Sequence, residues 1–411
     1  MRRAIAVLLL LCGADPLPAQ ERVVGVVFTG LERTRPEYLH RFVQTGPGAQ
    51  YDSLQVARDA QALRNLRLFV DVTTATTDTA DGKRVTFHCP EVLAVLPILN
   101  FGGIRGNGWI QVGGQDFNWR GRGQTVGGYY RYDQRHSFDL YHRAPRRWGP
   151  WGLNTEVSRS ATVENAPVPG ISRQVEVDRW AFTVSGRYTR SPRLSFELGW
   201  SYLNERYAPQ GQAAPAPAAY DKLLVKAVVL NDRIDYFYHY LSGRAGELTA
   251  EAVKTLDEPR IFWKLLGLGR YFRRLGSWGN LALRLRAGVS RNDDSPFVPF
   301  VLDSYLTVRG SGNQVARGTA ELTLNAEYRV TLLQRQWGAV QWVGFADWSA
   351  WRKPAAELQD MFAENNTVTF VGAGARVILS RLNFLVLRLD YGTSVTSPGD
   401  HGFVVGTGQY F

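Results

Sequence analysis

The chain has 411 residues with two cysteines and 41 glycines, 45% of the residues are hydrophobic and 12% aromatic, and the formal charge is +11. The two cysteines exclude a disulfide scaffold, and the many aromatic residues argue against a disordered chain. The mean hydropathy is −0.22, and after the first dozen residues no apolar run reaches the length of about 18 residues that a helical membrane span needs. The class of protein that these exclusions leave is a large β protein.

Residues 1–20 are expected to be a secretory signal peptide. Two arginines precede an apolar run at 4–11, and small residues follow up to Ala19, which is the charged, apolar and small-residue order of such a signal. A buried N-terminal helix is the alternative. Lipidation of Cys12 is disfavoured, because a leucine precedes it where a lipoprotein signal has a small residue. After cleavage, Cys89 has no partner for an internal disulfide bond. The sequence therefore predicts an exported protein.

Residues 21–92 predict a small α+β domain with the order βααββ. A strand is expected at 23–28 and a helix at 35–44. A second helix, which Asp52 or Ser53 caps, carries leucines at helical spacing, and two strands follow. These two strands are expected at 68–74 and 85–95.

From residue 93 onward the hydrophobic period is two. Leu281, Leu283 and Leu285 share one face of a segment, and Arg284 and Arg286 share the other. Alternating segments of about ten residues are typical of transmembrane β-barrels, in which every main-chain amide pairs with a neighbouring strand. The segments are about sixteen in number: 93–101, 107–119, 122–133, 136–144, 150–162, 176–190, 193–206, 221–232, 242–255, 259–273, 277–290, 317–333, 338–350, 366–377, 381–392 and 401–411.

The competing folds for 93–411 are a soluble β-sandwich and a β-helix. A sandwich would bury its apolar face and would not repeatedly need charged residues such as Arg388 and Asp390 on the opposite face. A sandwich also rarely extends over 300 residues. The pattern thus favours a sixteen-stranded antiparallel barrel.

Arginine dominates the basic residues, since only six of the 48 are lysine. In a soluble protein such a charge would suggest nucleic-acid binding. Here the arginines are spread singly along the alternating segments of an exported chain. They are better explained by a lumen lined with arginine or by contacts with anionic lipid, and no nucleic-acid partner is expected.

The final segment predicts a terminal barrel signal at Gly406 and Phe411. A last strand that ends in an aromatic residue is common in outer-membrane barrels. The second aromatic residue of that pattern would stand at position 409, which is glutamine here.

The chain resembles the superfamily of outer-membrane assembly and secretion factors that join POTRA domains to a sixteen-stranded barrel (the BamA/TamA-like proteins and the two-partner-secretion proteins). The POTRA resemblance lies in 23–28 and in the helix-to-strand pattern of Leu63, Leu66 and Phe69. The segment 118–123, Asn-Trp-Arg-Gly-Arg-Gly, is similar to the family's turn between the second and third barrel strands. The resemblance implies a barrel at the bacterial outer membrane and a POTRA-like domain in the periplasm. Family members usually carry more than one such domain, so this chain resembles an accessory member with one.

The most specific part of the resemblance is Arg309-Gly310, on a long segment, 291–316, that breaks the alternation. In the family this loop folds into the lumen, and its arginine contacts an acidic residue of a Phe-x-Asp-x-Gly strand. The corresponding residues here are Phe345 and Asp347, with serine in place of the glycine, and Glu327 resembles a second acidic partner. The resemblance thus implies a loop lock inside the lumen. The alternative is a solvated loop arginine.

The sequence contains no catalytic, phosphate-binding or metal-binding motif, and only His136 and His142 are spaced so that they could share a metal. We expect neither an enzyme nor a cofactor nor a metal site.

Three functions remain open. The first is insertion, assembly or translocation of polypeptides at the outer membrane, with clients bound by β-augmentation at the POTRA edge, which is expected at strand 84–95. The second is a passive or anion-selective channel. The third is a structural or surface-binding barrel that uses loops such as 208–220. Expected partners are outer-membrane lipid including lipopolysaccharide and unfolded client polypeptides, with the barrel a monomer, alone or within a complex.

Overall fold

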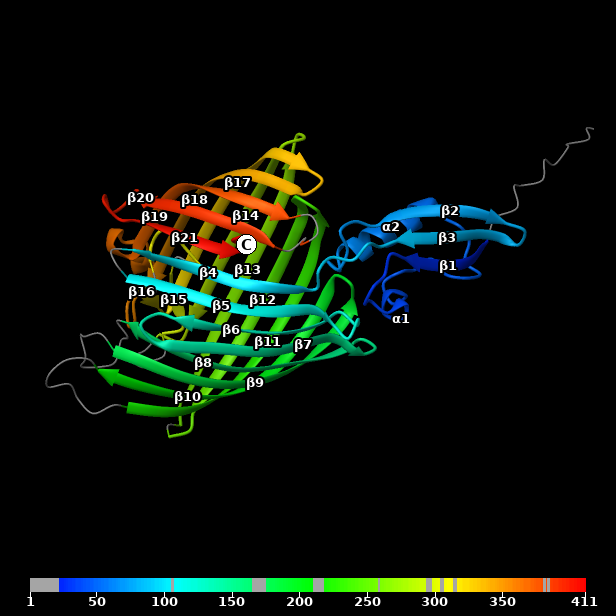
Figure 1. Cartoon of the computed structure of the whole chain (residues 1–411). Coiled ribbons are helices and arrows are strands. Elements are labelled where there is room, and N and C mark those ends of the chain that lie inside the picture. Colours follow the sequence, from blue (N-terminus) through cyan, green and yellow to red (C-terminus); the bar gives the residue numbers. More distant parts are fainter. Residues whose placement is uncertain are drawn as a thin grey trace, which may run out of the picture.

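The computed structural model of the protein describes residues 22–104, 107–164, 175–209, 218–257, 259–292, 298–303, 307–312, 316–379, 382 and 385–411. The expected signal peptide with Cys12, most of loop 208–220 and parts of segment 291–316 lie outside these residues. Figure 1 shows two parts, a barrel and a small N-terminal unit at one of its ends.

The structure confirms the predicted fold class. Sixteen strands form a closed antiparallel barrel, in which each strand pairs with its neighbours in the chain and β21 pairs with β4. Its strands are β4 (Val95–Ile104), β5 (Asn107–Trp119), β6 (Gln124–Tyr132), β7 (His136–Trp148), β8 (Trp151–Glu164), β9 (Val175–Ser191), β10 (Leu194–Pro209), β11 (Ala218–Phe237), β12 (Tyr240–Thr255), β13 (Ile261–Leu275), β14 (Gly279–Ser290), β17 (Ala320–Arg335), β18 (Gly338–Arg352), β19 (Thr367–Leu379), β20 (Val386–Ser394) and β21 (His401–Thr407).

The alternation of the sequence separates the two faces of the barrel wall. On β20, Leu387, Leu389 and Tyr391 are exposed on the outer face, whereas Arg388 and Asp390 are buried on the inner one. The apolar side chains therefore face outward and the charged ones face the lumen, as a barrel in lipid requires.

The N-terminal unit is a three-stranded sheet with two helices. Its elements are β1 (Val23–Thr29), α1 (Pro36–Leu39), α2 (Ser53–Arg64), β2 (Thr73–Thr79) and β3 (Gly82–His88), and the strand order is β1-β3-β2 with β1 parallel to β3. Leu63 and Phe69 are buried in its core, and Leu66 packs against that core. The Asp52 carboxylate accepts a 2.8 Å hydrogen bond from the main-chain N–H of Leu54, which caps α2.

The first helix is shorter than predicted, because α1 ends at Leu39 where the sequence indicated a helix over 35–44. The Asp59 carboxylate of α2 accepts hydrogen bonds from the main-chain N–H groups of Gln44 and Thr45, at 3.1 and 2.8 Å. These amides therefore bond to the second helix and do not extend the first.

Among the described residues, no helix is both long enough and apolar enough to cross a membrane.

The prediction of the POTRA edge at 84–95 is wrong. β3 begins at Gly82 and lies in the middle of the sheet, with β1 and β2 at its two edges. The sequence missed the turn before Gly82, whose φ of +137° and contact with the main-chain oxygen of Arg22 leave no space for a side chain. Because this turn lies at 80–81, the preceding strand runs to Thr79. This strand, β2, pairs with β3 alone and therefore forms one edge of the sheet.

The last strand is also shorter than the predicted 401–411. β21 ends at Thr407, and Gly408, with φ of +89°, turns the chain. Tyr410 is then buried, and Phe411 packs against a cluster that includes Phe272 of β13. The final residues therefore turn into the lumen and do not extend the barrel wall.

Replacement of Leu63 by alanine is expected to destabilise the POTRA unit by about 2–5 kcal/mol, because it leaves a cavity in a fully buried site. Leu54 on the same helix is 70% exposed, so Leu54→Ala is the matched control, with an expected cost of about 0.5 kcal/mol or less. Hydrogen exchange of the α2 and β3 amides in the intact protein measures both. Equal exchange in the two variants would contradict this placement of the core.

Candidate functional site

The segment between β14 and β17 leaves the barrel wall and enters the lumen. Two short strands, β15 (Phe300–Leu302) and β16 (Ala316–Gly318), pair with each other. Between them, the main-chain N–H groups of Thr307 and Val308 both donate to the carbonyl oxygen of Asp303, at 3.2 and 2.9 Å. Arg309 follows directly and lies next to the wall, with none of its surface exposed.

Arg309 is held by two carboxylates of the barrel wall. Its main-chain N–H and its Nε donate to Oδ2 of Asp347 at 3.0 and 2.8 Å, and its Nη2 donates to Oδ1 at 2.8 Å. Its Nη1 donates to Glu327 on the neighbouring strand β17. A planar guanidinium can bridge two carboxylates in this way, whereas an ammonium group cannot.

Two aromatic rings flank the same guanidinium. Its central carbon lies 3.7 Å from the ring centroid of Phe345 and 4.3 Å from that of Tyr410. The sequence did not point to Tyr410, because its position depends on the turn at Gly408. Cation–π contacts of this kind stabilise a cation that water cannot reach. The side chain is therefore bound at its edges by carboxylates and on its faces by rings.

Gly310 brings the loop into direct contact with strand β20. Its φ is +88°, and a Cβ there would lie 2.8 Å from the main-chain oxygen of Gly392. A Cβ on Gly392 would in turn lie 2.7 Å from the oxygen of Arg309. Both glycines are thus required by a close main-chain approach. The sequence indicated Gly310 and missed Gly392, which lies about 80 residues further along the chain.

Further polar side chains complete this group. Asn325 donates from Nδ2 to Asp347 at 2.7 Å and to the carbonyl oxygen of Thr307 at 2.8 Å. Arg329 donates to Glu327 at 2.7 Å. The side chains that hold the loop in the lumen are Thr307, Arg309, Asn325, Glu327, Arg329, Phe345, Asp347 and Tyr410, which we call the lumen lock. Asn325 and Arg329 are two residues on either side of Glu327, so the period of two could have indicated them.

The junction of β21 with β4 closes the barrel with few hydrogen bonds. Among the described residues, three residue pairs form it, Phe403–Gly103, Val404–Gly102 and Val405–Phe101, against seven pairs between β20 and β21 and ten between β4 and β5. One side-chain contact extends it, because Asn100 Oδ1 accepts a 2.9 Å hydrogen bond from the N–H of Thr407.

Gly406 lies at this same junction. A Cβ there would be 2.6 Å from Asn100 Oδ1. Of the two expected terminal signal residues, Gly406 therefore lies beside β4, whereas Phe411 lies in the lumen, where its main-chain oxygen is 3.3 Å from Arg329 Nη2.

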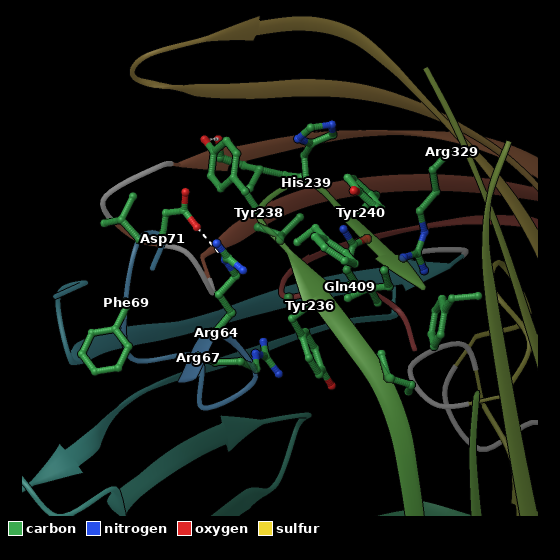
Figure 2. A pocket seen from close by; sticks show the side chains of 18 of the residues that line it. Arg64, Arg67, Phe69, Asp71, Tyr236, Tyr238, His239, Tyr240, Arg329 and Gln409 are labelled. Carbon is green, nitrogen blue, oxygen red and sulfur yellow. Dashed lines mark hydrogen bonds and ion pairs between the residues drawn. The ribbon is translucent and has the colours of Figure 1, made fainter. Parts of the chain in front are cut away.

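The POTRA unit contacts the mouth of the barrel. Asn65, at the end of α2, donates from Nδ2 to Asp235 Oδ1 at 2.9 Å and accepts from the N–H of Tyr236 at 3.1 Å. A cavity of about 630 Å³ lies beside this contact. Figure 2 shows it between the POTRA residues Arg64, Arg67 and Phe69, the β11–β12 turn and Gln409 of the C-terminal segment.

The turn between β11 and β12 reaches across this end of the barrel. The His239 carbonyl oxygen accepts a 2.7 Å hydrogen bond from Gln341 Nε2 on β18, and the Tyr238 hydroxyl lies 3.4 Å from the carbonyl oxygen of Ile378 on β19. Burial lowers the pKa of His239. The turn therefore contacts β18 and β19 through a carbonyl oxygen and a hydroxyl group.

Within the described residues, no group of three or more His, Cys, Asp or Glu side chains could hold a metal ion. His136 and His142, the two that the sequence spacing singled out, contact Tyr130 and Gln124 respectively.

A family model of the POTRA domain, described as "Surface antigen variable number repeat", matches residues 22–89. No curated protein matches the sequence. Three solved structures share the fold, each at 12% sequence identity. BamA from Haemophilus ducreyi lacking POTRA domains 1–3 has a TM-score of 0.56 and is matched over 94% of this chain and 84% of its own.

The other two are CdiB proteins. CdiB from Acinetobacter baumannii has a TM-score of 0.59, with 95% of this chain and 74% of that chain covered, and CdiB from Escherichia coli has 0.64, with 94% and 76% covered. The chain therefore joins a POTRA domain to a sixteen-stranded barrel. Its fold is that of BamA and CdiB, with one POTRA-like domain in the described residues.

Replacement of Arg309 by methionine is expected to destabilise the barrel by about 3–5 kcal/mol, because Asp347 and Glu327 lose the cation that compensates them in a buried site. Urea-induced unfolding of the purified protein in vesicles measures the difference. Arg335, the exposed last residue of β17, provides the control Arg335→Met, which should change stability by about 0.5 kcal/mol or less. An unchanged midpoint for Arg309→Met would show that the lumen lock does not stabilise the barrel.

Proposed function

We propose that the protein assists the insertion, assembly or translocation of polypeptides at the bacterial outer membrane, without enzymatic activity, and that its POTRA unit lies in the periplasm. The observation that carries this proposal is the three-pair junction between β4 and β21 in a barrel whose mouth holds a POTRA domain. The fold shared with BamA and CdiB supports the same class of function.

The junction is the place where the wall opens at the lowest cost. A hydrogen bond contributes about 0.5–1.5 kcal/mol net to stability, so the three residue pairs described between β4 and β21 hold these strands more weakly than the fourteen that join β10 to β11. In lipid, the unpaired edges would need a new partner strand. A client strand at the open junction would supply one.

The lumen lock stiffens one side of this junction. Through Asp347, Glu327 and Gly392 it joins the loop to β18, β17 and β20. On β20, Asp390 pairs with Arg376 of β19 at 2.8 Å. The C-terminal strands therefore form one cross-linked group. None of these contacts involves β4, so opening would move β4 away from this group.

The POTRA unit would bind clients at β2. This strand pairs with β3 on one side only, and all but the last of its seven residues are exposed. An exposed edge strand presents unpaired main-chain groups that an extended peptide can join. Five of the seven residues are threonine, a residue that favours the extended conformation without adding an apolar surface.

Three parts of the chain occupy the lumen and its mouth, and they argue against a passive pore: the loop that carries Arg309, the Tyr410–Phe411 end and the β11–β12 turn. Planar-bilayer recordings of the purified protein should therefore show no large steady conductance. A steady anion-selective current would favour the channel hypothesis instead.

A disulfide bond across the junction is expected to abolish function. Phe101 and Val405 are opposite each other in the ladder, so Phe101→Cys with Val405→Cys, in a Cys89→Ala background, links β4 to β21. The levels of outer-membrane and secreted proteins should fall in cells that depend on this variant and recover when a reductant opens the bond.

The matched control is Tyr391→Cys with Phe403→Cys, which links the opposed residues of β20 and β21 on the same outer face. This pair should leave function unchanged, because it joins strands that already move together. Full function of the Phe101–Val405 link in its oxidised form would rule out lateral opening at the junction.

Clients are expected at β2. A photo-crosslinking amino acid at Thr76, in the middle of the edge strand, should capture outer-membrane or secreted polypeptides in living cells. The same probe at Leu54, exposed on α2, is the control and should capture far less. Equal capture at the two positions would show that the β2 edge is not the client site.

A further inference from the structure

A second, strongly basic pocket lies where the POTRA unit meets the barrel. It has a volume of about 300 Å³ and is separate from the cavity of Figure 2. Five of the eight residues that line it are arginines. The POTRA unit contributes Arg35 and Arg41, and the ends of the barrel strands contribute Arg122, Arg146 and Arg147.

Main-chain contacts fix the two halves of this pocket. The N–H of Arg35 donates to the carbonyl oxygen of Gly121 at 2.9 Å, and Arg41 Nη1 donates to the carbonyl oxygen of Arg146 at 3.0 Å. Gly121 has a φ of +69°, and a Cβ there would lie 1.9 Å from the main-chain oxygen of Arg33. The Asn-Trp-Arg-Gly-Arg-Gly turn is therefore shaped to receive the POTRA unit.

The charges of the pocket are not compensated by the protein. Glu37 is its one carboxylate, and no ion pair links any of the five arginines to an acidic residue in the part of the chain that the structure describes. Arg146 and Arg147 instead lie over the rings of Phe42 and Trp148, at 4.9 and 5.2 Å.

Tyr38 adds a hydroxyl group to the wall of the pocket. Burial raises the pKa of Tyr38 to about 12, so the hydroxyl stays protonated at neutral pH and can donate a hydrogen bond. With the arginines it forms a set of donors that suits the oxygens of an anion.

The pocket lies at the level of a tryptophan belt. Trp119, Trp148 and Trp151 are exposed at the strand ends that border it. Trp278 and Trp337 are exposed in turns at the same end of the barrel. Exposed tryptophans gather where lipid headgroups meet the hydrocarbon, so the arginines that line the pocket beside these tryptophans lie at headgroup depth. Figure 1 shows the POTRA unit at this end of the barrel.

We propose that this pocket binds the phosphate of an anionic phospholipid from the leaflet next to the POTRA unit, and that the lipid holds the POTRA unit against the barrel. The inference rests on the membrane placement given under the proposed function. Arginine pairs with phosphate in a bidentate manner, and basic residues at the membrane surface attract anionic lipid. A headgroup bound here would contact arginines of both domains at once and would relieve their mutual repulsion.

The test uses the full-length protein in a mild detergent, with lipid retention read by native mass spectrometry. The variant is Arg35→Gln/Arg122→Gln/Arg147→Gln, whose three arginines are exposed and donate none of the side-chain hydrogen bonds described above. The control is Arg190→Gln/Arg193→Gln/Arg335→Gln, which removes three exposed arginines at the same end of the barrel. Heat-modified migration on gels verifies that both barrels are folded.

The wild type and the control should retain one phosphatidylglycerol in preference to phosphatidylcholine. Each arginine near a membrane surface strengthens the binding of an anionic lipid roughly fivefold. The variant, which lacks three of them, should therefore bind phosphatidylglycerol on the order of 100-fold more weakly. Equal retention by variant and control would overturn the proposal. Displacement of the lipid by millimolar inorganic phosphate, with no preference between the two lipids, would overturn the lipid assignment in favour of a free phosphate site. Lipid retention needs no client, so this result does not depend on the insertion or translocation activity.

Discussion

The buried guanidinium of Arg309 is the interaction on which the rest of the barrel depends. A charge without solvent contact is costly unless opposite charges and hydrogen bonds compensate it. Asp347 and Glu327 supply those charges from two adjacent strands, and Phe345 and Tyr410 cover the two faces of the plane. To satisfy this one side chain, the loop must enter the lumen, the chain end must turn inward, and three strands must keep their register.

The consequence is a barrel with unequal sides. The strands that surround the lumen lock are joined by ladders and by buried polar contacts, whereas in the described part of the chain three residue pairs join β4 to β21, with the hydrogen bond from Thr407 to Asn100 beside them. A wall of this kind can open at one place without losing the remainder of its structure. The same asymmetry would be without value in a passive pore, which needs an unobstructed lumen and a uniform wall.

The POTRA unit is connected to the barrel at several of its turns. Asn65 contacts the end of β11, Arg35 contacts the β5–β6 turn, and Arg41 contacts the end of β7. These contacts do not involve β2, which forms an edge of the POTRA sheet. The basic pocket lies within this interface, so a bound headgroup would couple the position of the POTRA unit to the membrane surface. The client site on the POTRA unit, the junction in the barrel wall and the lipid site would then be mechanically connected.

The alternation of apolar and charged residues determined the barrel, the number of its strands and the faces of residues such as Arg388 and Asp390, because the period of a strand is a local property. The POTRA pattern around Leu63 and Phe69 could also be recognised in the sequence, because it lies within one short segment that resembles the family. The meeting of Arg309 with Asp347 was implied by resemblance alone.

Only the tertiary structure decided which strand is the POTRA edge, where α1 ends and where the chain end goes. The place of β2 at the edge follows from the parallel pairing of β1 with β3, which the order of elements does not specify. The carboxylate of Asp59 binds the amides of Gln44 and Thr45 after α1, and the inward path of Tyr410 depends on the turn at Gly408. Each is set by contacts between residues distant in the sequence, which no local pattern records. The basic pocket also has this origin, since its arginines come from segments about 80 to 110 residues apart.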